Sequence, residues 1–360
     1  MTTRLYLDHA ATTPMTAAAR AAVADGMARW ANPSSPHAEG RAARAALEAA
    51  RGAIGTAYGW RGEVLLTSGA SESLGLALGR AGVARRLVSA VEHDAVLRAA
   101  PDAGVLGVDA EGLLTRTWAG ASRPTGSEGR ALVCVQWANS ETGVRQPIAA
   151  IADAVHADGH LLLVDAAQMP AGVDADVADH ADFVALSAHK RGGPPGVGAL
   201  LVRDLATLTP TGGQERGYRP GTENLPGALG YAAALAEPEP LDRWAALRAR
   251  LDDAVARSGG EVVAPTSSRH PAIGSYRMPG VAQTTQLIRF DLAGIAVSAG
   301  SACSSGSLKP SHVLGAMGWS EKSSREVLRI SFGRDTDEAD VERAIAAWRD
   351  IARAARRLAA

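Results

Sequence analysis

Two short apolar runs decide the fold of this chain: Leu162-Leu163-Val164-Asp165-Ala166-Ala167-Gln168 and Phe183-Val184-Ala185-Leu186-Ser187-Ala188-His189-Lys190. Each run is apolar without interruption and then changes to polar residues. Strands with this pattern are covered on both faces, as in a mainly parallel α/β sheet. The first run delivers a carboxylate, Asp165, at its C-terminal end, and the second delivers a lysine, Lys190.

Similar apolar runs recur along the middle of the chain. They predict buried strands at 64–67, 86–89, 132–135, 161–164, 183–186 and 198–202. Helical patterns separate most of these strands, for example over residues 148–157. Strands that alternate with helices indicate an α/β fold with a mainly parallel sheet.

The length of the chain predicts two domains, because 360 residues exceed the size at which one hydrophobic core keeps growing. Pro238 and Pro240 mark a boundary before a long helix over about 241–258. A smaller α/β unit should follow, with strands near 261–263 and 330–332 and a last helix over about 337–358. We expect a large domain over 15–240 and a small domain made of 1–14 and 241–360.

Composition excludes several classes of protein. The formal net charge of -1 gives no electrostatic reason to expect a nucleic-acid partner. No apolar stretch approaches the ~20 residues that cross a bilayer. The first eight residues lack the apolar core of a signal peptide, so we expect a cytoplasmic protein without membrane contact.

The chain has two cysteines, Cys134 and Cys303. Their number and separation predict neither a disulfide nor a zinc site, and we expect no metal. Cys134 lies in an apolar run and is expected to be buried. Cys303 lies in the small, polar segment 298–307, which is the accessible setting that a reactive thiol needs, although a loop cysteine can also be incidental.

Asp165 and Lys190 together suit pyridoxal phosphate. A lysine amine forms a Schiff base with the cofactor aldehyde, and a carboxylate keeps the ring nitrogen protonated, so that the ring acts as an electron sink. A lysine after a strand is ordinarily a solvated surface residue. The other motifs around it favour the cofactor.

Two further segments support a site of this kind. Thr67-Ser68-Gly69-Ala70-Ser71-Glu72-Ser73 follows a predicted strand and opens a helix, where small residues and the helix dipole favour an anion such as a phosphate. Serine and threonine before a helix are often only caps. His93 closely follows another predicted strand; it is either a satisfied polar residue or an imidazole that stacks on the cofactor ring and moves protons.

Eleven motifs in order along nearly the whole chain resemble those of the cysteine desulfurases. They are Leu7-Asp8-His9-Ala10-Ala11-Thr12-Thr13-Pro14, Asn32-Pro33-Ser34-Ser35-Pro36-His37, Ser68-Gly69-Ala70-Ser71-Glu72-Ser73, Glu92-His93, Asn139-Ser140-Glu141-Thr142-Gly143, Asp165-Ala166-Ala167-Gln168, Ser187-Ala188-His189-Lys190, Gly212-Gly213-Gln214-Glu215-Arg216, Arg219-Pro220-Gly221-Thr222, Gly300-Ser301-Ala302-Cys303 and Arg329-Ile330-Ser331-Phe332-Gly333-Arg334. Any one motif is weak, but the ordered set is very specific.

This resemblance implies a pyridoxal phosphate fold-type-I enzyme of the class-V aminotransferase group. It implies a homodimer with a mainly parallel seven-stranded sheet in the large domain and a smaller α/β domain. By similarity, Lys190 binds the cofactor, Asp165 pairs with its ring nitrogen, and His93 stacks over the ring. The remaining cofactor contacts would be Ala70, Ser71, Asn139, Gln168, Ser187, His189 and, from the partner subunit, Thr222. The substrate would be held by Arg329, Asn139 and Asn32.

The implied reaction converts L-cysteine to L-alanine and leaves a persulfide on Cys303. Lys190 would take the Cα proton and the Cys303 thiolate would attack the substrate sulfur. Rival hypotheses are a selenocysteine lyase, another class-V enzyme, or a sulfur-relay scaffold without catalysis. The acceptor protein stays open among iron–sulfur assembly, tRNA thiolation and related sulfur metabolism. The sequence differs from the residues that are most common in the family directly after Asn139, at Ser71 and over 191–195.

Overall fold

The computed structural model describes residues 4–115, 129–300 and 310–359. A seven-stranded sheet lies at the centre of its larger part, in the order β2-β8-β7-β6-β5-β3-β4. The strands are β2 (Glu63–Thr67), β3 (Arg85–Ser89), β4 (Gly104–Leu106), β5 (Ala131–Gln136), β6 (Leu161–Asp165), β7 (Phe183–Ser187) and β8 (Gly198–Val202). Within this sheet β8 runs antiparallel to both of its neighbours, and the other strands share one direction. The predicted mainly parallel seven-stranded sheet is confirmed.

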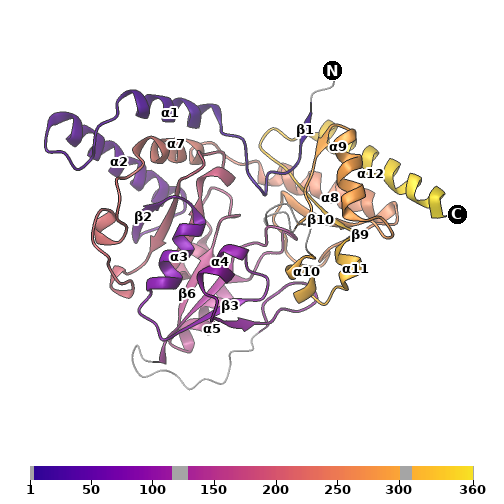
Figure 1. The fold of residues 1–360 in the computed structure, drawn as a ribbon, viewed down its shortest axis with the longest axis horizontal. Helices are drawn as coiled ribbons and strands as arrows, with labels where there is room; N and C mark the ends of the chain where they lie inside the picture. The colour runs from indigo at the N-terminus through magenta and orange to yellow at the C-terminus, as the bar shows by residue number, and fades with distance from the viewer. Residues whose placement is uncertain (1–3, 116–128, 301–309, 360) are drawn as a thin grey trace.

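Both faces of this sheet are buried, which explains the uninterrupted apolar runs. Leu162 and Val164 of β6 face a core shared with α2 (Ala38–Ala57), α5 (Ile148–Ala157) and α7 (Leu225–Leu235). Leu161 and Leu163 of the same strand face the opposite core, shared with α3 (Ala70–Arg80) and α4 (Asp94–Ala99). The helix α1 (Ala17–Ala28) packs on the outside of α7 (Figure 1). The helix α6 (Ala175–His180) lies beside α5.

The C-terminal part forms a smaller α/β unit with its own core. Its elements are α8 (Leu241–Arg257), β9 (Glu261–Val262), β10 (Ile273–Arg277), α9 (Gln283–Leu292), β11 (Ile295–Ala296), α10 (His312–Ala316), α11 (Glu321–Ser324), β12 (Val327–Ser331) and α12 (Glu338–Ala359). The strands β12, β10 and β9 form an antiparallel sheet, and α8 and α12 pack together on it. The exact domain boundaries at residues 14 and 240 stay a prediction. Within the described ranges, no helix combines the length and the apolar character that crossing a membrane requires.

The N-terminal segment connects this smaller unit to the large sheet. β1 (Leu5–Tyr6) pairs in parallel with β11, so the first strand of the chain belongs with the C-terminal elements (Figure 1). Asp8 then forms a bridge with Ser331, and the backbone N–H of Thr13 donates to the carbonyl of His189 at 2.8 Å. This segment therefore lies where the two units meet, next to Lys190.

Candidate active site

A cavity of about 430 Å³ lies at the carboxyl edge of the seven-stranded sheet. The strands β2, β5, β6 and β7 share one direction, so the residues that follow them meet at this edge, as expected for ligand sites in α/β sheets. Nine of the predicted site residues line the cavity: Ala70, Ser71, His93, Asp165, Gln168, Ser187, His189, Lys190 and Arg329. Residues as far apart in the sequence as Ala70 and Arg329 thus form one site.

Asp165 enters the cavity from the end of β6 and is almost fully buried. Its Oδ1 accepts the backbone N–H of Ala167 at 3.0 Å, which fixes the carboxylate. Behind it lies a second carboxyl group, Glu92, with no exposed surface. Burial, together with the charge of Asp165, raises the pKa of Glu92 well above its usual range. Burial therefore disfavours a second negative charge beside Asp165.

Lys190 ends a single 3-10 turn, Ala188–Lys190, directly after β7. Because β7 is the parallel neighbour of β6, this turn brings the amine into the cavity that Asp165 lines. His93 reaches the same cavity from the N-terminus of α4, where its Nδ1 accepts the backbone N–H of Ala95 at 3.1 Å. That bond leaves the proton of the neutral imidazole on Nε2. Burial and the nearby charge of Lys190 lower the pKa of His93, which favours the neutral ring.

The segment before α3 forms a cup at the wall of the cavity. Ser68, Gly69, Ala70 and Ser71 line it, and Gly69, the N-cap residue, provides no side-chain cap for the first turn of this 11-residue helix. The helix N-terminus therefore keeps backbone donors for an anion. Ser187 and His189 line the same cavity and can add donors of their own. Burial, with the charge of Lys190, lowers the pKa of His189 to about 4.

The residues present fit pyridoxal phosphate. The cup suits the phosphate, Asp165 suits a protonated ring nitrogen, and Lys190 suits the aldehyde. Gln168 donates from Nε2 to the carbonyl of Ala10 at 2.9 Å, while its buried Oε1 has no partner among the described residues. An unpartnered acceptor in a cavity is what a polar group of a ligand would satisfy.

Arg329 of β12 brings a buried guanidinium to the cavity from the C-terminal unit. Its Nη2 contacts Asp8 Oδ1 at 2.6 Å, and its Nη1 donates to the carbonyl of Ser140 at 2.9 Å. Its Nε has no partner among the described residues. The N-terminal segment, through Asp8, therefore orients the cation predicted to bind the substrate carboxylate.

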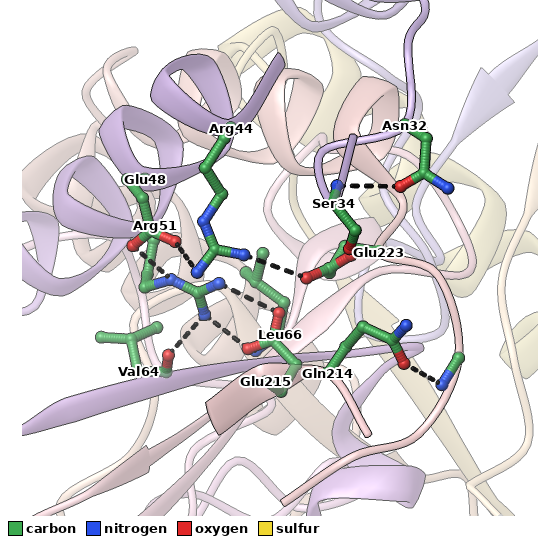
Figure 2. Close-up of polar contacts among 11 residues, drawn as sticks. Asn32, Ser34, Arg44, Glu48, Arg51, Val64, Leu66, Gln214, Glu215 and Glu223 are labelled. Atoms are coloured by element: carbon green, nitrogen blue, oxygen red, sulfur yellow. Dashed lines mark hydrogen bonds and ion pairs between the residues drawn. The ribbon is translucent and has the colours of Figure 1, made fainter. Parts of the chain in front are cut away.

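Three predicted residues do not line this cavity. Asn139 is buried in local bonds: its Oδ1 accepts the backbone N–H groups of Glu141 and Thr142, and its Nδ2 donates to the carbonyl of Val91 at 3.0 Å. Asn32 is exposed, and its Oδ1 accepts the backbone N–H of Ser34 at 2.9 Å (Figure 2). Thr222 is exposed as well. Their predicted roles stay predictions, and Cys303 lies outside the described residues.

The cavity also has lining residues that sequence reasoning did not select. Ser140 and Gln136 follow or end β5, and Ala10 and Ala11 come from the N-terminal segment. Ser140 stands next to Asn139 in the same motif, so the motif does lie at the cavity. Gln136 ends an apolar run as Asp165 does, and that position was its only signal in the sequence.

Cys134, the other cysteine of the chain, is unsuited to act as a nucleophile. Cys134 lies in β5 with no exposed surface, and burial, with the charges of Glu92 and Asp165, raises the pKa of its thiol well above its usual range. Because the thiolate is the reactive form, this residue is an inert part of the core. The expected burial of Cys134 is confirmed.

Comparison with known proteins identifies the relatives of this chain. The aminotransferase class-V family matches residues 5–344. A cysteine desulfurase of Gluconacetobacter diazotrophicus is 36% identical over 95% of this chain and 91% of its own length. An IscS-like cysteine desulfurase of Mycobacterium tuberculosis is 37% identical over 94% of each chain. The solved structure of a NifS-like protein from Rickettsia africae superposes with a TM-score of 0.84 at 28% identity, covering 97% of this chain and 99% of the other.

Proposed function

Because this chain belongs to the aminotransferase class-V family, among relatives named cysteine desulfurases, we propose that it is a pyridoxal phosphate-dependent cysteine desulfurase. It converts L-cysteine to L-alanine and passes the sulfur, held as a persulfide on Cys303, to an acceptor protein. The observation that carries this function is the meeting of Lys190, Asp165, His93 and the α3 cup in one cavity.

The residues divide the work of holding the cofactor. The α3 N-terminus with Ser71, Ser187 and His189 holds the phosphate, and Asp165 holds a proton at the ring nitrogen. When bound, pyridoxal phosphate supplies an electron sink next to the substrate Cα. The imidazole of His93 gives a flat face for the cofactor ring. Asn139 would keep the turn over residues 139–142 in shape, because its Oδ1 accepts two backbone N–H groups of that turn.

Substrate binding and proton transfer fall to charged residues. Arg329, which lines the cavity, binds the carboxylate of L-cysteine, and Asp8 keeps the guanidinium in place. The Nζ of Lys190 takes the Cα proton and returns a proton to the product carbon. The partner subunit's Thr222 completes the phosphate site in a homodimer.

Sulfur transfer requires a thiolate that can take up the sulfur atom in the site and then carry it to an acceptor. The thiolate of Cys303 attacks the substrate sulfur; a new S–S bond forms, the substrate Cβ–S bond breaks, and the carbon keeps the electron pair until it is protonated. Cys134 cannot substitute for it, since it is buried inside β5. An acceptor protein then removes the sulfur from Cys303, as in iron–sulfur cluster assembly or tRNA thiolation.

The direct test is the formation of alanine and sulfide from L-cysteine by the purified protein supplied with pyridoxal phosphate and dithiothreitol. We expect one alanine per sulfide, and faster release when the right acceptor is present. Selenocysteine is tested in parallel as substrate. No alanine from L-cysteine, with rapid alanine from selenocysteine, would assign the protein to the lyases instead.

A further inference from the structure

One face of α2 has a row of charged side chains that lies away from the cavity. Arg44, Glu48 and Arg51 follow one another at steps of four and three residues (Figure 2). Glu48 contacts both arginines at 3.1 Å. Each arginine also reaches a glutamate of a distant segment, Glu223 for Arg44 and Glu215 for Arg51. These two glutamates bracket residues 216–222.

Arg51 and Glu215 form a buried ion pair, and most of the polar atoms of the two side chains have hydrogen-bond partners. The two η nitrogens of Arg51 contact the two carboxylate oxygens of Glu215 at 2.5 and 3.0 Å, as a parallel fork (Figure 2). Glu215 Oε2 also accepts the backbone N–H of Leu66 at 2.8 Å, and Arg51 donates to the carbonyl of Val64 at 2.7 Å. Both backbone partners belong to β2, the strand that leads into the cup. One ion pair therefore fixes α2, β2 and the start of the 216–222 segment.

The backbone at this place is strained in a way that needs support. Glu215 and Arg216 both have positive φ, 47° and 57°, a region that residues other than glycine seldom occupy. Gly213, Gly217 and Gly221 are also in that region. Such a conformation persists where surrounding contacts impose it, and it occurs mainly at functional sites.

The other end of the segment has a single, longer ion pair, whose arginine is about half exposed. The side chain of Glu223 is 1% exposed and contacts Arg44 Nη1 at 3.5 Å. Because Arg44 and Arg51 are seven residues apart on one helix, the two ends are anchored about 10 Å apart on a rigid support. Inside the loop, Gln214 Oε1 accepts the backbone N–H of Gly221 at 2.8 Å (Figure 2).

The segment so held ends in an exposed threonine. Arg219 contacts Glu72 of the cup at 2.8 Å, so one side of the loop lies against the cup of its own chain. Thr222 is exposed and does not line the cavity of its own chain. A rigid loop with a hydroxyl presented to solvent suits contact with another molecule.

We propose that the Arg51–Glu215 pair is a positioning device for Thr222, which it holds preformed for the phosphate site of a second copy of this chain. This inference rests on the proposed function, in which Thr222 acts across the dimer. Without the pair, the loop samples other conformations, and the affinity for the cofactor falls with the fraction of molecules whose loop is correctly shaped. Neither Arg51 nor Glu215 lines the cavity.

The test is a double-mutant cycle read as cofactor affinity, not as turnover. The full-length protein is freed of cofactor and titrated with pyridoxal phosphate, in the variants Thr222→Ala, Arg51→Lys and the combination of both. Lysine keeps the charge but loses the fork. We expect each single variant to bind about tenfold more weakly: Arg51→Lys because fewer loops are correctly shaped, and Thr222→Ala because the hydroxyl contact with the phosphate is lost. We expect the double variant to bind no more weakly than Thr222→Ala.

Two matched controls separate positioning from stability. Arg269→Lys makes the same change in an arginine whose side chain is also 6% exposed and whose partner is Asp252 in the C-terminal unit. It should lower thermal stability as Arg51→Lys does, yet leave cofactor affinity unchanged. If Arg51→Lys fails to fold, Gly221→Ala replaces it, since a side chain at φ 105° strains the loop without filling a packed space; Gly280→Ala, at φ 79° with open surroundings, is its control.

The possible outcomes separate a failure of the positioning role from a failure of the proposed desulfurase function. Wild-type affinity in Arg51→Lys beside weakened binding in Thr222→Ala would refute the positioning role and leave the desulfurase proposal intact. Additive losses in the double variant would show that the pair acts independently of Thr222, and would also refute it. Wild-type affinity in Thr222→Ala would remove Thr222 from the phosphate site itself.

Discussion

At the scale of single residues, two neighbouring parallel strands bring opposite charges to one cavity. Asp165 ends β6, and Lys190 follows β7 by one short turn. Both were predicted from their places after apolar runs, and so was His93. A sequence shows where a strand ends, but not which side chain of a turn faces inward. For that reason the sequence did not single out Ser140, which lines the cavity, from its neighbour Asn139.

Lys190→Ala tests the residue with the most roles. Loss of the base alone should lower alanine formation by about 10²–10⁴-fold, and loss of the cofactor attachment should lower it further. The variant should also release pyridoxal phosphate during gel filtration, measured by absorbance of the protein fraction. Lys322→Ala, an exposed lysine on α11, is the control and should behave as wild type. Comparable turnover in Lys190→Ala would mean that another amine holds the cofactor.

At the scale of elements, the cup depends on a close approach between two strands and a loop. Gly198 begins β8, and a Cβ there would lie 2.4 Å from the carbonyl oxygen of Leu186 and 2.6 Å from Cα of Gly69. Only a residue without a side chain lets the cup rest against the sheet in this way. The shape of the phosphate site is thus set partly by a residue that does not line it.

Gly198→Ala should therefore damage both stability and cofactor binding. Overpacking of this kind costs about 1–3 kcal/mol, and the displaced cup should bind pyridoxal phosphate more weakly. Urea unfolding and cofactor titration measure the two effects. Gly79→Ala, inside α3 with no atom near its Cβ, should instead be neutral or stabilise by about 0.5–1 kcal/mol. Unchanged cofactor affinity in Gly198→Ala would show that this contact does not shape the cup.

The elements also show what the sequence could predict. The six predicted strands of the large sheet were confirmed because burial on both faces leaves continuous apolar runs. The helix predicted over 148–157 has the same limits as α5, Ile148–Ala157. Four strands of the described residues were missed. β1 and β11 have only two residues each, too few to show a pattern. β4 is a three-residue edge strand whose Val105 is 65% exposed, and β10, Ile-Gly-Ser-Tyr-Arg, lacks both continuous and alternating apolar character. Both are held by pairing with partners distant in the sequence.

At the scale of the whole molecule, the two units meet around histidines that stay neutral. Burial lowers the pKa of His9, and its surroundings include Arg191 and Arg334 from the two units; the result is about 4, as for His189. An unfolded chain protonates histidine near pH 6.5. Between pH 6.5 and 4 the unfolded state therefore binds more protons than the folded state, so that stability falls as pH falls through this window.

The pH dependence can be assigned to one residue by substitution. The urea midpoint of the cofactor-free protein should fall between pH 6.5 and pH 4.5, and it should fall less steeply in His9→Gln, in which one of these groups no longer titrates. The two proteins are compared at each pH by fluorescence. Parallel slopes would show that His9 is protonated to the same extent in both states.

The central claim is that sulfur from L-cysteine passes to Cys303, which mass spectrometry tests most directly. The pyridoxal phosphate-loaded protein is treated with L-cysteine, alkylated and digested, beside the variant Cys303→Ala. We predict that one or more extra sulfur atoms appear on the peptide that contains Cys303, that alanine forms with them, and that the variant binds cofactor but transfers no sulfur. Extra sulfur on Cys134, or full desulfurase activity in Cys303→Ala, would contradict the account.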